Sequence, residues 1–353
     1  MSRLPGALLA LALSALLGAC VSPADPGVRS VSIMTFNVQN LFDTSDDPGR
    51  DDKAYLPLSV KQNAAHRAAC NEIEVTAWRE ECLYLDWNET VLEAKLAAVA
   101  KAIRGAGGGP DIIAFQEVEN LALLERLRKS HLAGLGYGPA ILIEGQDLRG
   151  IDVGFLAKLP LIGEPVLHPL EFPAFPEREA DTRGVLEATF ALPGGGRLTG
   201  FAVHFPAPFH PVAMRERAYR HLAELRAALP DENNVFAAGD FNTTSTEADE
   251  TRILDELVRP AWSIAHESGC PACRGTYYYA AGDNWSFLDM ILYSPARSAD
   301  ATWRLRENSA RIANTAPGQR TRAGTPQRFS ADDRAGVSDH WPLVVEIEPA
   351  PEQ

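Results

Sequence analysis

The stretch from Val235 to Asn242 constrains the fold of this chain more than any other part of the sequence. It reads Val-Phe-Ala-Ala-Gly-Asp-Phe-Asn, so apolar and small residues run directly into Asp240 and Asn242. A short apolar run of this kind is typical of a strand that is buried on both faces. Side chains two positions apart on an extended chain point to the same side. The stretch therefore predicts a layered α/β fold with its chemistry at a strand end, although a plain polar turn is an alternative at this point.

The length and the net charge of the chain limit the classes of function that it can have. The chain has 353 residues and a formal net charge of −14 at pH 7. A chain of this length can bury a full core without disulfides or bound metals. The acidic balance argues against a protein that binds nucleic acid tightly through a basic face. It does not exclude an enzyme that holds phosphate through a metal ion.

The N-terminus has the layout of an export signal. Arg3 precedes an apolar run from Ala7 to Leu17, and small residues then lead to Cys20. The run is too short to span a bilayer comfortably. Its ending resembles a bacterial lipoprotein signal, which implies cleavage before Cys20 and lipidation of Cys20. An ordinary cleaved signal is the alternative.

Val21, rather than Asp, follows the cysteine. This resembles sorting to the outer membrane. We expect an exported lipoprotein that faces the periplasm or the cell exterior, with the membrane as a partner through its anchor and no stable protein partner.

The other four cysteines, Cys70, Cys82, Cys270 and Cys273, form an even set. Even sets suit disulfides in an oxidising compartment. The simplest pairing is Cys70–Cys82 and Cys270–Cys273. A zinc site of His266, Cys270 and Cys273 is the rival interpretation, but it lacks an obvious fourth ligand.

We expect a single main domain with short flanking segments. These are a signal peptide over 1–19, a tether over 20–30, the domain over 31–348 and a tail over 349–353. Within the domain, residues 43–88 are predicted to be an irregular insertion that begins with an acidic run over 43–52. Ca²⁺ is a possible ligand of that run, but the spacing of known calcium loops is missing, so a solvated charged loop is favoured.

Periodic patterns place the remaining elements. Apolar residues on one face predict helices over 89–104 and 212–229, and a further helix is expected over 119–130. The strand candidates are 31–36, 111–115, 140–143, 151–156, 185–191, 198–204, 235–239, 287–293 and 342–348. Strands outnumber helices, which favours a layered α/β fold over a helical bundle.

Polar residues of the kind that phosphoryl chemistry needs recur at the strand ends. They are Asn37, Glu117, His204, Asp240, Asn242, Asp289 and His340. Asp289 lies inside an otherwise apolar strand, where a carboxylate is rarely buried without a partner. A histidine is a good candidate for that partner. Any one of these residues could be incidental, but so many at strand termini indicate a common site.

Six motifs, in their order along the chain, resemble those of the endonuclease/exonuclease/phosphatase superfamily. They are Phe36-Asn37-Val38-Gln39-Asn40, Phe115-Gln116-Glu117-Val118, Val203-His204, Gly239-Asp240-Phe241-Asn242, Leu288-Asp289 and Ser338-Asp339-His340. The superfamily includes pancreatic-type deoxyribonucleases, abasic-site endonucleases, bacterial sphingomyelinases and inositol-polyphosphate phosphatases. The resemblance implies a four-layer α/β sandwich, in which two mixed β-sheets pack face to face with helices outside.

The resemblance also implies a metal site and a base. Glu117 would be the main carboxylate on Mg²⁺ (or Mn²⁺), with Asn37 nearby and Asp339 beside the metal. His340 would take a proton from the attacking water, and Asp289 would accept the other ring N–H.

Three further residues complete the implied chemistry. Asp240 and Asn242 would orient the nucleophile and bind the phosphoryl oxygens. His204 matches a histidine of the deoxyribonuclease-like and sphingomyelinase-like branches that protonates the leaving oxygen.

Two arginines and a carboxylate are weaker candidates for substrate binding. Arg183 resembles a phosphate-contacting arginine of the deoxyribonuclease-like branch, with a solvated turn residue as the alternative. Arg149 and Asp152 lead into a buried strand and could face the same cleft, or form a plain surface pair.

We therefore expect an exported Mg²⁺-dependent phosphodiesterase, with nucleic acid as the first choice of substrate. A phospholipid or small phosphoester hydrolase is the alternative, and a non-catalytic surface-binding lipoprotein is the second. The acidic insertion and the missing basic groove argue against long duplex DNA. No membrane-inserting hydrophobic hairpin of a sphingomyelinase type is evident.

Overall fold

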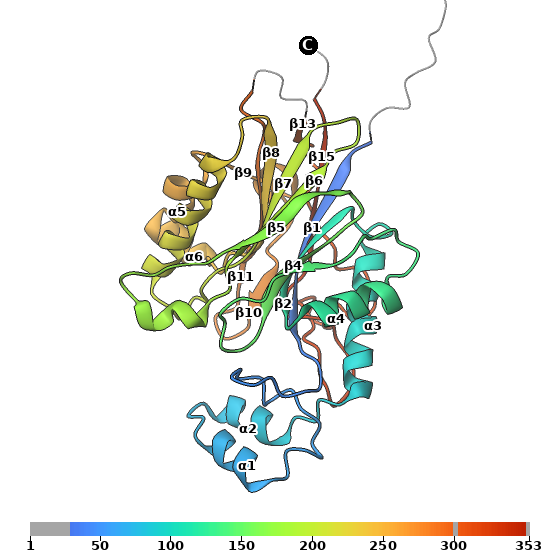
Figure 1. The fold of residues 1–353 in the computed structure, drawn as a ribbon, viewed down its shortest axis with the longest axis vertical. Coiled ribbons are helices and arrows are strands. Elements are labelled where there is room, and N and C mark those ends of the chain that lie inside the picture. Colours follow the sequence, from blue (N-terminus) through green and yellow to red (C-terminus); the bar gives the residue numbers. More distant parts are fainter. Residues whose placement is uncertain (1–28, 299–302, 351–353) are drawn as a thin grey trace, which may run out of the picture.

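The computed structural model describes residues 29–298 and 303–350, so the predicted signal peptide and Cys20 lie outside the described residues. Two large sheets dominate it (Figure 1). The first sheet contains β1 (Val31–Leu41), β2 (Ile112–Val118), β3 (Ile141–Leu142), β4 (Asp152–Ala157), β13 (Trp303–Leu305), β14 (Arg311–Ile312) and β15 (Leu343–Pro349). The second contains β5 (Leu161–His168), β6 (Val185–Ala191), β7 (Arg197–His204), β8 (Asn233–Asp240), β9 (Ser263–Ile264) and β12 (Asp289–Ser294).

Both sheets are mixed. The strand orders are β13-β15-β1-β2-β4-β3, with β14 against β15, and β5-β6-β7-β8-β12-β9. β1 and β2 run parallel in the first sheet, and β7 and β8 run parallel in the second. The other pairs within these two sheets are antiparallel.

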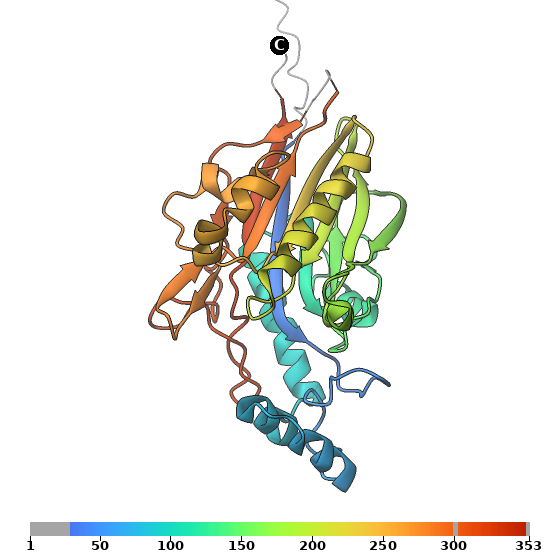
Figure 2. The ribbon, with the colours of Figure 1, turned by 90° about the vertical axis from the view of Figure 1, so that its left-hand side faces the viewer.

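The sheets pack face to face with helices outside, as expected. A cluster of buried apolar side chains, including Ile33, Phe155 and Ile291, fills the space between the sheets. Helices α3 (Glu89–Gly105) and α4 (Leu121–Arg126) cover the outer face of the first sheet, and α5 (Val212–Ala228) covers that of the second. Figure 2 shows α3 and α5 on different sides of the strands. The predicted four-layer α/β sandwich is confirmed.

Strand β8, which contains most of the stretch from Val235 to Asn242, is buried along its whole length. Every residue of β8 is buried. Phe236 and Ala238 join the cluster between the sheets, whereas Val235 and Ala237 join the cluster under α5. A strand between two apolar layers has no polar face, which is why its sequence shows no alternation.

The segment 43–88 is not irregular throughout, which corrects the prediction. It contains α1 (Ala64–Asn71) and α2 (Thr76–Tyr84), joined by the Cys70–Cys82 disulfide. The ammonium group of the buried Lys61 donates hydrogen bonds to the carbonyl oxygens of Ala54 and Leu85, at 2.6 and 2.7 Å. Both helices are short and bury few residues, so their sequences carry little apolar periodicity.

Several other elements were missed or shorter than expected. The helix predicted over 119–130 is α4 followed by a π-helical turn, Leu127–His131. Strand β5 has no alternation because it is an edge strand without a buried residue. The elements that the sequence patterns did not indicate also include the hairpin of β10 (Tyr277–Tyr279) and β11 (Asn284–Ser286) and the short helices α6 (Ser245–Thr251) and α7 (Ala265–Gly269).

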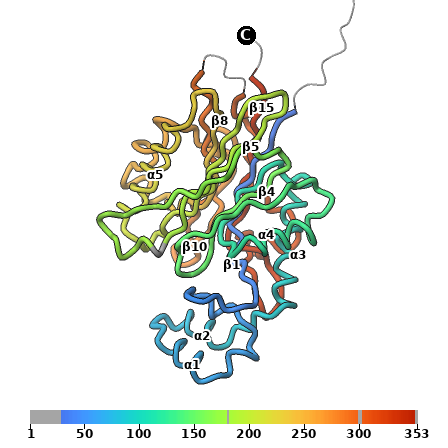
Figure 3. The backbone as a smooth tube through the Cα atoms, viewed as in Figure 1, coloured from blue at the N-terminus to red at the C-terminus, as the bar shows by residue number. Residues whose placement is uncertain are grey.

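The two ends of the sandwich differ. The start of β1 and the end of β15 lie at one end, and α1 and α2 lie at the other, beyond the strands (Figures 1 and 3). No helix within the described part of the chain is long and apolar enough to cross a membrane. The carboxyl ends of β1, β2, β7 and β8 face the end that carries α1 and α2.

The close approach of β7 and β8 leaves no room for a side chain at Gly239. A Cβ atom at Gly239 would overlap the carbonyl oxygen of Val203 in the neighbouring strand. We expect Gly239→Ala to lower the free energy of unfolding by about 1–3 kcal/mol, because the two strands must separate to fit the methyl group. Urea or thermal denaturation measures this loss.

Gly138→Ala is the matched control. Its Cβ would lie 3.5 Å from its nearest neighbour, the carbonyl oxygen of Ala157, which is ordinary van der Waals contact. If both variants unfold at the same midpoint as the wild type, the packing argument for Gly239 is wrong.

Candidate active site

The polar residues predicted at strand ends converge at one end of the sandwich. Asn37 and Glu117 come from the parallel pair β1 and β2 of the first sheet. His204 and Asp240 lie opposite each other in the parallel pair β7 and β8 of the second sheet, and Asp289 of β12 lies opposite Asp240 on its other side. Parallel strands end at the same edge, so the fold itself brings these side chains together.

The side-chain amide of Asn37 links carboxylates from the two sheets. Its Nδ2 donates to Glu117 Oε1 and to Asp240 Oδ2, each at 3.1 Å. Its Oδ1 accepts a hydrogen bond from the backbone N–H of Gln39 at 3.0 Å. Asn37 is buried, so in this structure it orients the predicted metal carboxylate and is itself covered.

The backbone around Glu117 departs from regular strand geometry. The register between β1 and β2 shifts after Asn37, and Gln39, Asn40 and Glu117 have positive φ angles of 56°, 54° and 64°. The N–H of Asn40 donates to Glu117 Oε2 at 2.8 Å. A left-handed non-glycine residue costs on the order of 1–3 kcal/mol, and such residues concentrate at functional sites. Here they aim the Glu117 carboxylate.

His340 and Asp289 form the predicted pair. His340 Nδ1 lies 2.7 Å from Asp289 Oδ2, and Asp289 is fully buried. The hydroxyl of Ser338 donates to the carbonyl oxygen of Asn37 at 2.7 Å and accepts the N–H of His340 at 3.0 Å. These bonds anchor the loop before β15 to β1 and leave His340 Nε2 3.9 Å from Asp240 Oδ2. The arrangement fixes the ring and leaves Nε2 available for proton transfer.

Burial and neighbouring charges shift the pKa values in opposite directions. Burial alone would raise the pKa of Glu117, but nearby His204, Arg149 and His340 outweigh it and lower the pKa to about 2. Burial raises the pKa of Asp240 to about 7. Glu117 is therefore a permanent negative charge at neutral pH, as a metal carboxylate must be.

The two histidines also differ. Burial, with Arg183 nearby, holds the pKa of His204 well below its ordinary value. Burial would lower the pKa of His340 too, but Asp289 and two further carboxylates raise it well above the ordinary value. Positive charge placed beside Glu117 would work against the shift of His340, because like charges disfavour the imidazolium form.

The predicted substrate-binding residues separate into two groups. Arg149 and Arg183 line the same cavity as His340. Arg149 donates to Asn40 Oδ1 at 2.6 Å, and Arg183 pairs with the carboxylate of Asp147. Asp152 does not face this cleft, which corrects the expectation. Its Oδ1 instead accepts the N–H of Gly145 at 2.8 Å and holds the loop before β4.

Asn242 and Asp339 reach the cavity through bonded loops. Asn242 Nδ2 donates to the carbonyl oxygen of Phe205 at 3.0 Å, while its own N–H donates to Asp240 Oδ1 at 2.9 Å. The N–H of Asp339 donates to Gln39 Oε1 at 3.1 Å. The sequence motif assigns no role to Gln39, yet its side chain ties the loop that carries Asp339 to the end of β1.

The cavity has a volume of about 920 Å³. Its walls include the predicted residues Glu117, His204, Asp240, Asn242, Asp339 and His340. Aromatic side chains that the sequence did not indicate complete it, namely Trp78, Phe209, Tyr277 and Tyr279. Trp78 comes from α2, and both tyrosines come from β10. The sequences of these two elements have no clear apolar periodicity, so only the tertiary structure could show that they border the cavity.

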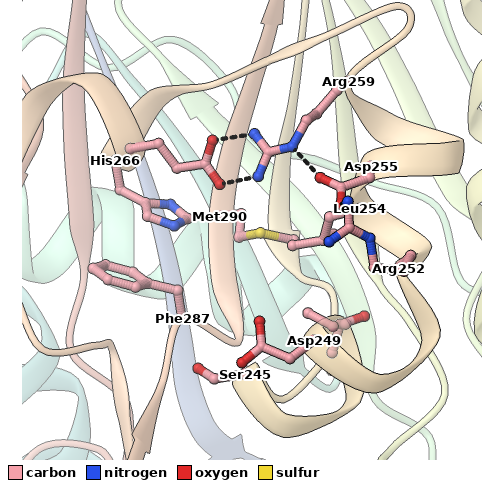
Figure 4. Close-up of a pocket in the computed structure, with 12 residues that line it drawn as sticks. Ser245, Asp249, Arg252, Leu254, Asp255, Arg259, His266, Phe287 and Met290 are labelled. Atoms are coloured by element: carbon pink, nitrogen blue, oxygen red, sulfur yellow. Dashed lines mark hydrogen bonds and ion pairs between the residues drawn. The ribbon is translucent and has the colours of Figure 1, made fainter.

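A smaller pocket of about 210 Å³ contains none of the predicted catalytic residues. Arg259 lies between Asp255 and Glu267 and pairs with both (Figure 4). His266 stacks on Phe287 with ring centroids 3.8 Å apart. Its neighbours Cys270 and Cys273 form the second predicted disulfide, so the alternative zinc site is not formed.

The donor set of the large cavity fits a hard divalent cation. Glu117 and Asp339 both present carboxylates to it, and Glu117 is held ionised. Asp240, Asp289 and His340 also come within 4.8 Å of one another. Oxygen ligands with water completing the shell are what Mg²⁺ and Mn²⁺ prefer. Glu117, with Asp339 beside it, would hold the ion.

Comparison with known proteins agrees with this geometry. A profile described as "Endonuclease/Exonuclease/phosphatase family" matches residues 34–340. The chain belongs to this family. It is therefore an enzyme of the metal-dependent phosphoric ester hydrolase class, and the non-catalytic alternative loses its support. A search of curated proteins gives no significant match.

Solved structures share the fold at low sequence identity. A humanized form of D. rerio TDP2 is 16% identical with a TM-score of 0.53, covering 90% of this chain and 99% of that one. The Bacteroides thetaiotaomicron mannosyl-6-phosphatase Bt3783 is 15% identical with a TM-score of 0.55, again covering 90% of this chain and 99% of that one. A protein of this family from Beutenbergia cavernae is 17% identical with a TM-score of 0.54, covering 91% of this chain and 72% of that one.

The pair of His340 and Asp289 predicts a specific kinetic defect. We expect Asp289→Asn to lower kcat by about 100-fold or more with little change in KM. Asparagine lacks the carboxylate that orients the imidazole of His340 and stabilises its positive charge. Steady-state kinetics on a chromogenic phosphodiester measures this.

Glu187→Gln is the matched control, because Glu187 pairs with His168 at 2.8 Å outside the cavity. It should keep wild-type kcat. Thermal melting of both variants separates a kinetic defect from unfolding. Equal kcat values for the two variants would contradict the assigned role of Asp289.

Proposed function

We propose that this enzyme is a Mg²⁺-dependent phosphodiesterase that hydrolyses single-stranded or short nucleic acids. One observation carries the proposal: a single cavity is lined by Glu117, by His340 with Asp289 behind its ring, and by exposed aromatic side chains. His340, Asp289 and Glu117 supply the hydrolysis of a phosphoester. The aromatic side chains favour a substrate with flat bases.

Each residue of the site has its own role in the reaction. His340 Nε2 takes the proton from the attacking water, while Asp289 holds the ring through Nδ1. Asp240, which lies in β8 between His204 of β7 and Asp289 of β12, and Asn242 bind the nucleophile and the phosphoryl oxygens. His204, 3.7 Å from Asp240, donates a hydrogen bond to the leaving oxygen. Glu117 would hold the divalent cation, which would supply Lewis-acid polarisation of a phosphoryl oxygen.

The rim of the cavity favours unpaired bases. Trp78, Phe209 and Tyr279 are 58%, 76% and 52% exposed, although large aromatic side chains usually lie buried. Stacking of a base on such a side chain is worth about 1–3 kcal/mol. A structure of D. rerio TDP2, 15% identical with a TM-score of 0.52, is described as complexed with a single-strand DNA product, which supports the same choice.

Charge argues against long duplex DNA. The chain carries a formal net charge of −14. Arg149, Arg178 and Arg183 line the cavity, but α1 and α2 extend beyond the strand ends on that side of the molecule (Figure 1). Three arginines in one cavity can hold a short phosphodiester backbone, whereas a duplex needs an extended basic face.

A small phosphoester hydrolase is the second candidate. It is favoured by the similarity to the mannosyl-6-phosphatase of Bacteroides thetaiotaomicron. A phospholipid hydrolase gains less support, because the turn of the β10–β11 hairpin is Ala280-Ala281-Gly282-Asp283, without a large apolar side chain to enter a membrane.

The deciding experiment offers the purified chain several substrates with Mg²⁺ and with EDTA. We expect cleavage of single-stranded oligonucleotides with Mg²⁺ alone, slower cleavage of duplex DNA, and loss of activity in Glu117→Gln because the cation is no longer held. Exclusive hydrolysis of mannose 6-phosphate or of sphingomyelin would replace the nuclease proposal. Full activity in EDTA would contradict the metal dependence.

The aromatic rim has an internal control in α2. Trp78→Ala should raise KM for an oligonucleotide by about tenfold, with kcat and the KM for a bis-aryl phosphate unchanged. Tyr84 lies in the same helix, is exposed and does not line the cavity, so Tyr84→Ala should change nothing. Equal effects of both variants would rule out base stacking at Trp78.

We propose that the enzyme is exported and anchored to the outer membrane through a lipid on Cys20. The N-terminal signal pattern and the even set of cysteines support this. Both predicted disulfides are formed, as expected for an oxidising compartment. A palmitate analogue should label the wild type but not Cys20→Ala. Persisting label in the variant would contradict lipidation at Cys20.

A further inference from the structure

A second acidic cluster lies outside the catalytic cavity. Asp47, Asp52 and Glu119 each present an oxygen, and these oxygens lie within 4.8 Å of one another. The first two belong to the acidic run over 43–52, and Glu119 follows the end of β2. None of the three lines the large cavity. The fold therefore gathers carboxylates from two distant segments at a place where catalysis does not need them.

Two of these carboxylates are deeply buried. Asp52 is 1% exposed and Glu119 is 3% exposed. Asp52 Oδ2 accepts the N–H of Asp47 at 2.9 Å, but Asp52 Oδ1 is buried and has no hydrogen-bond partner within the described part of the chain. A buried polar atom without a partner costs about 1–3 kcal/mol, and more when the group is charged. The orphaned oxygen of Asp52 therefore points to a missing ligand.

Within residues 29–298 and 303–350, the cluster has no positively charged partner. Among the described residues, no lysine or arginine forms an ion pair with Asp43, Asp47, Asp52 or Glu119. Lys53, the nearest cation in the sequence, pairs with Asp51 instead. Buried carboxylates usually pair with a cation or bind a metal. Among the described residues, these carboxylates do not pair with a cationic side chain.

Local hydrogen bonds hold the carboxylates in place. The N–H of Asp43 donates to Glu119 Oε2 at 2.6 Å, and Asn120 Nδ2 reaches Asp43 Oδ2 and Glu119 Oε2, both at 3.2 Å. All these donors are neutral amides. They orient the oxygens without neutralising their charge, and carboxylate lone pairs remain for a ligand.

We propose that Asp47, Asp52 and Glu119 form a Ca²⁺ site that is separate from the catalytic metal. The donors are all oxygens, which excludes a typical zinc site with its nitrogen and sulfur ligands. The oxygens lie within 4.8 Å of one another, close enough to share one ion, and Ca²⁺ accepts the irregular oxygen geometry of a loop, whereas Mg²⁺ demands a near-ideal octahedron. Water would complete the larger coordination shell of Ca²⁺.

The ion would fasten the insertion to the edge of the catalytic cavity. The N–H of Asp51 donates to the carbonyl oxygen of Leu148 at 2.6 Å, and the guanidinium of Arg50 donates to the carbonyl oxygens of Asp147 and Gly145. Leu148 and its neighbour Arg149 line the cavity. Calcium at this site stabilises the loop that carries Arg149, without entering the reaction.

The test uses the full chain in a Glu117→Gln background, so that the catalytic metal site does not contribute. After removal of metals, calorimetric titration with Ca²⁺ should show about one ion bound, and about 1 mM Ca²⁺ should raise Tm relative to EDTA. Tb³⁺ should bind the same site with luminescence sensitised by Tyr55, which stacks on Phe42 next to Asp43. Absence of both calcium binding and the shift in Tm would overturn the proposal.

Two further variants in that background locate the ion. Asp52→Asn with Glu119→Gln should abolish calcium binding and its shift in Tm, while Tm in EDTA stays equal or rises because buried charge is removed. Asp46→Asn, an exposed acid of the same run, should keep both. Calcium binding that survives the double change, or that Asp46→Asn also removes, would refute the assignment.

Discussion

The hydrogen bonds of the Asn37 side chain set the geometry on which the active site depends. One amide nitrogen donates to Glu117 of the first sheet and to Asp240 of the second. Two carboxylates that repel each other are thereby held at fixed positions by a single donor, in a region where the low dielectric strengthens both the bonds and the repulsion. The bond between His340 and Asp289 crosses between the sheets in the same way. The sandwich is thus fastened at its catalytic end by polar contacts, and along its length by apolar packing.

Charge explains why this end of the molecule is specialised. Glu117, Asp240, Asp289 and Asp339 lie close together, and Arg183 is already paired with Asp147. The protein accommodates the excess negative charge by raising the pKa of Asp240 and of His340 and by presenting Glu117 to the cavity. A divalent cation relieves the same repulsion and supplies the chemistry of phosphoester hydrolysis. A bound divalent cation would therefore both relieve the repulsion between the carboxylates and meet the requirement of catalysis.

Prediction from sequence succeeded where a pattern is imposed by burial. Strands β1, β2, β7 and β8 are apolar because layers cover both faces, and their terminal polar residues are visible for the same reason. The helices α3 and α5 showed their apolar stripes. Prediction failed for α1, α2 and the β10–β11 hairpin, which bury little apolar surface. Asp152 was misplaced because alternation along a strand does not tell which loop a carboxylate will meet.

The apolar strands of the sequence indicated the layered α/β fold, and the spacing of the cysteines favoured the two disulfides. The expected roles of Glu117 on a metal ion and of His340 with Asp289 came from the resemblance of six motifs to the superfamily. Only the tertiary structure decided that Asn37 joins two sheets, that Trp78 of α2 borders the cavity, and that Asp47 and Asp52 meet Glu119. These contacts join residues tens to hundreds of positions apart. No periodic pattern encodes such contacts, since they depend on how the insertion packs against strand ends that the core has already placed.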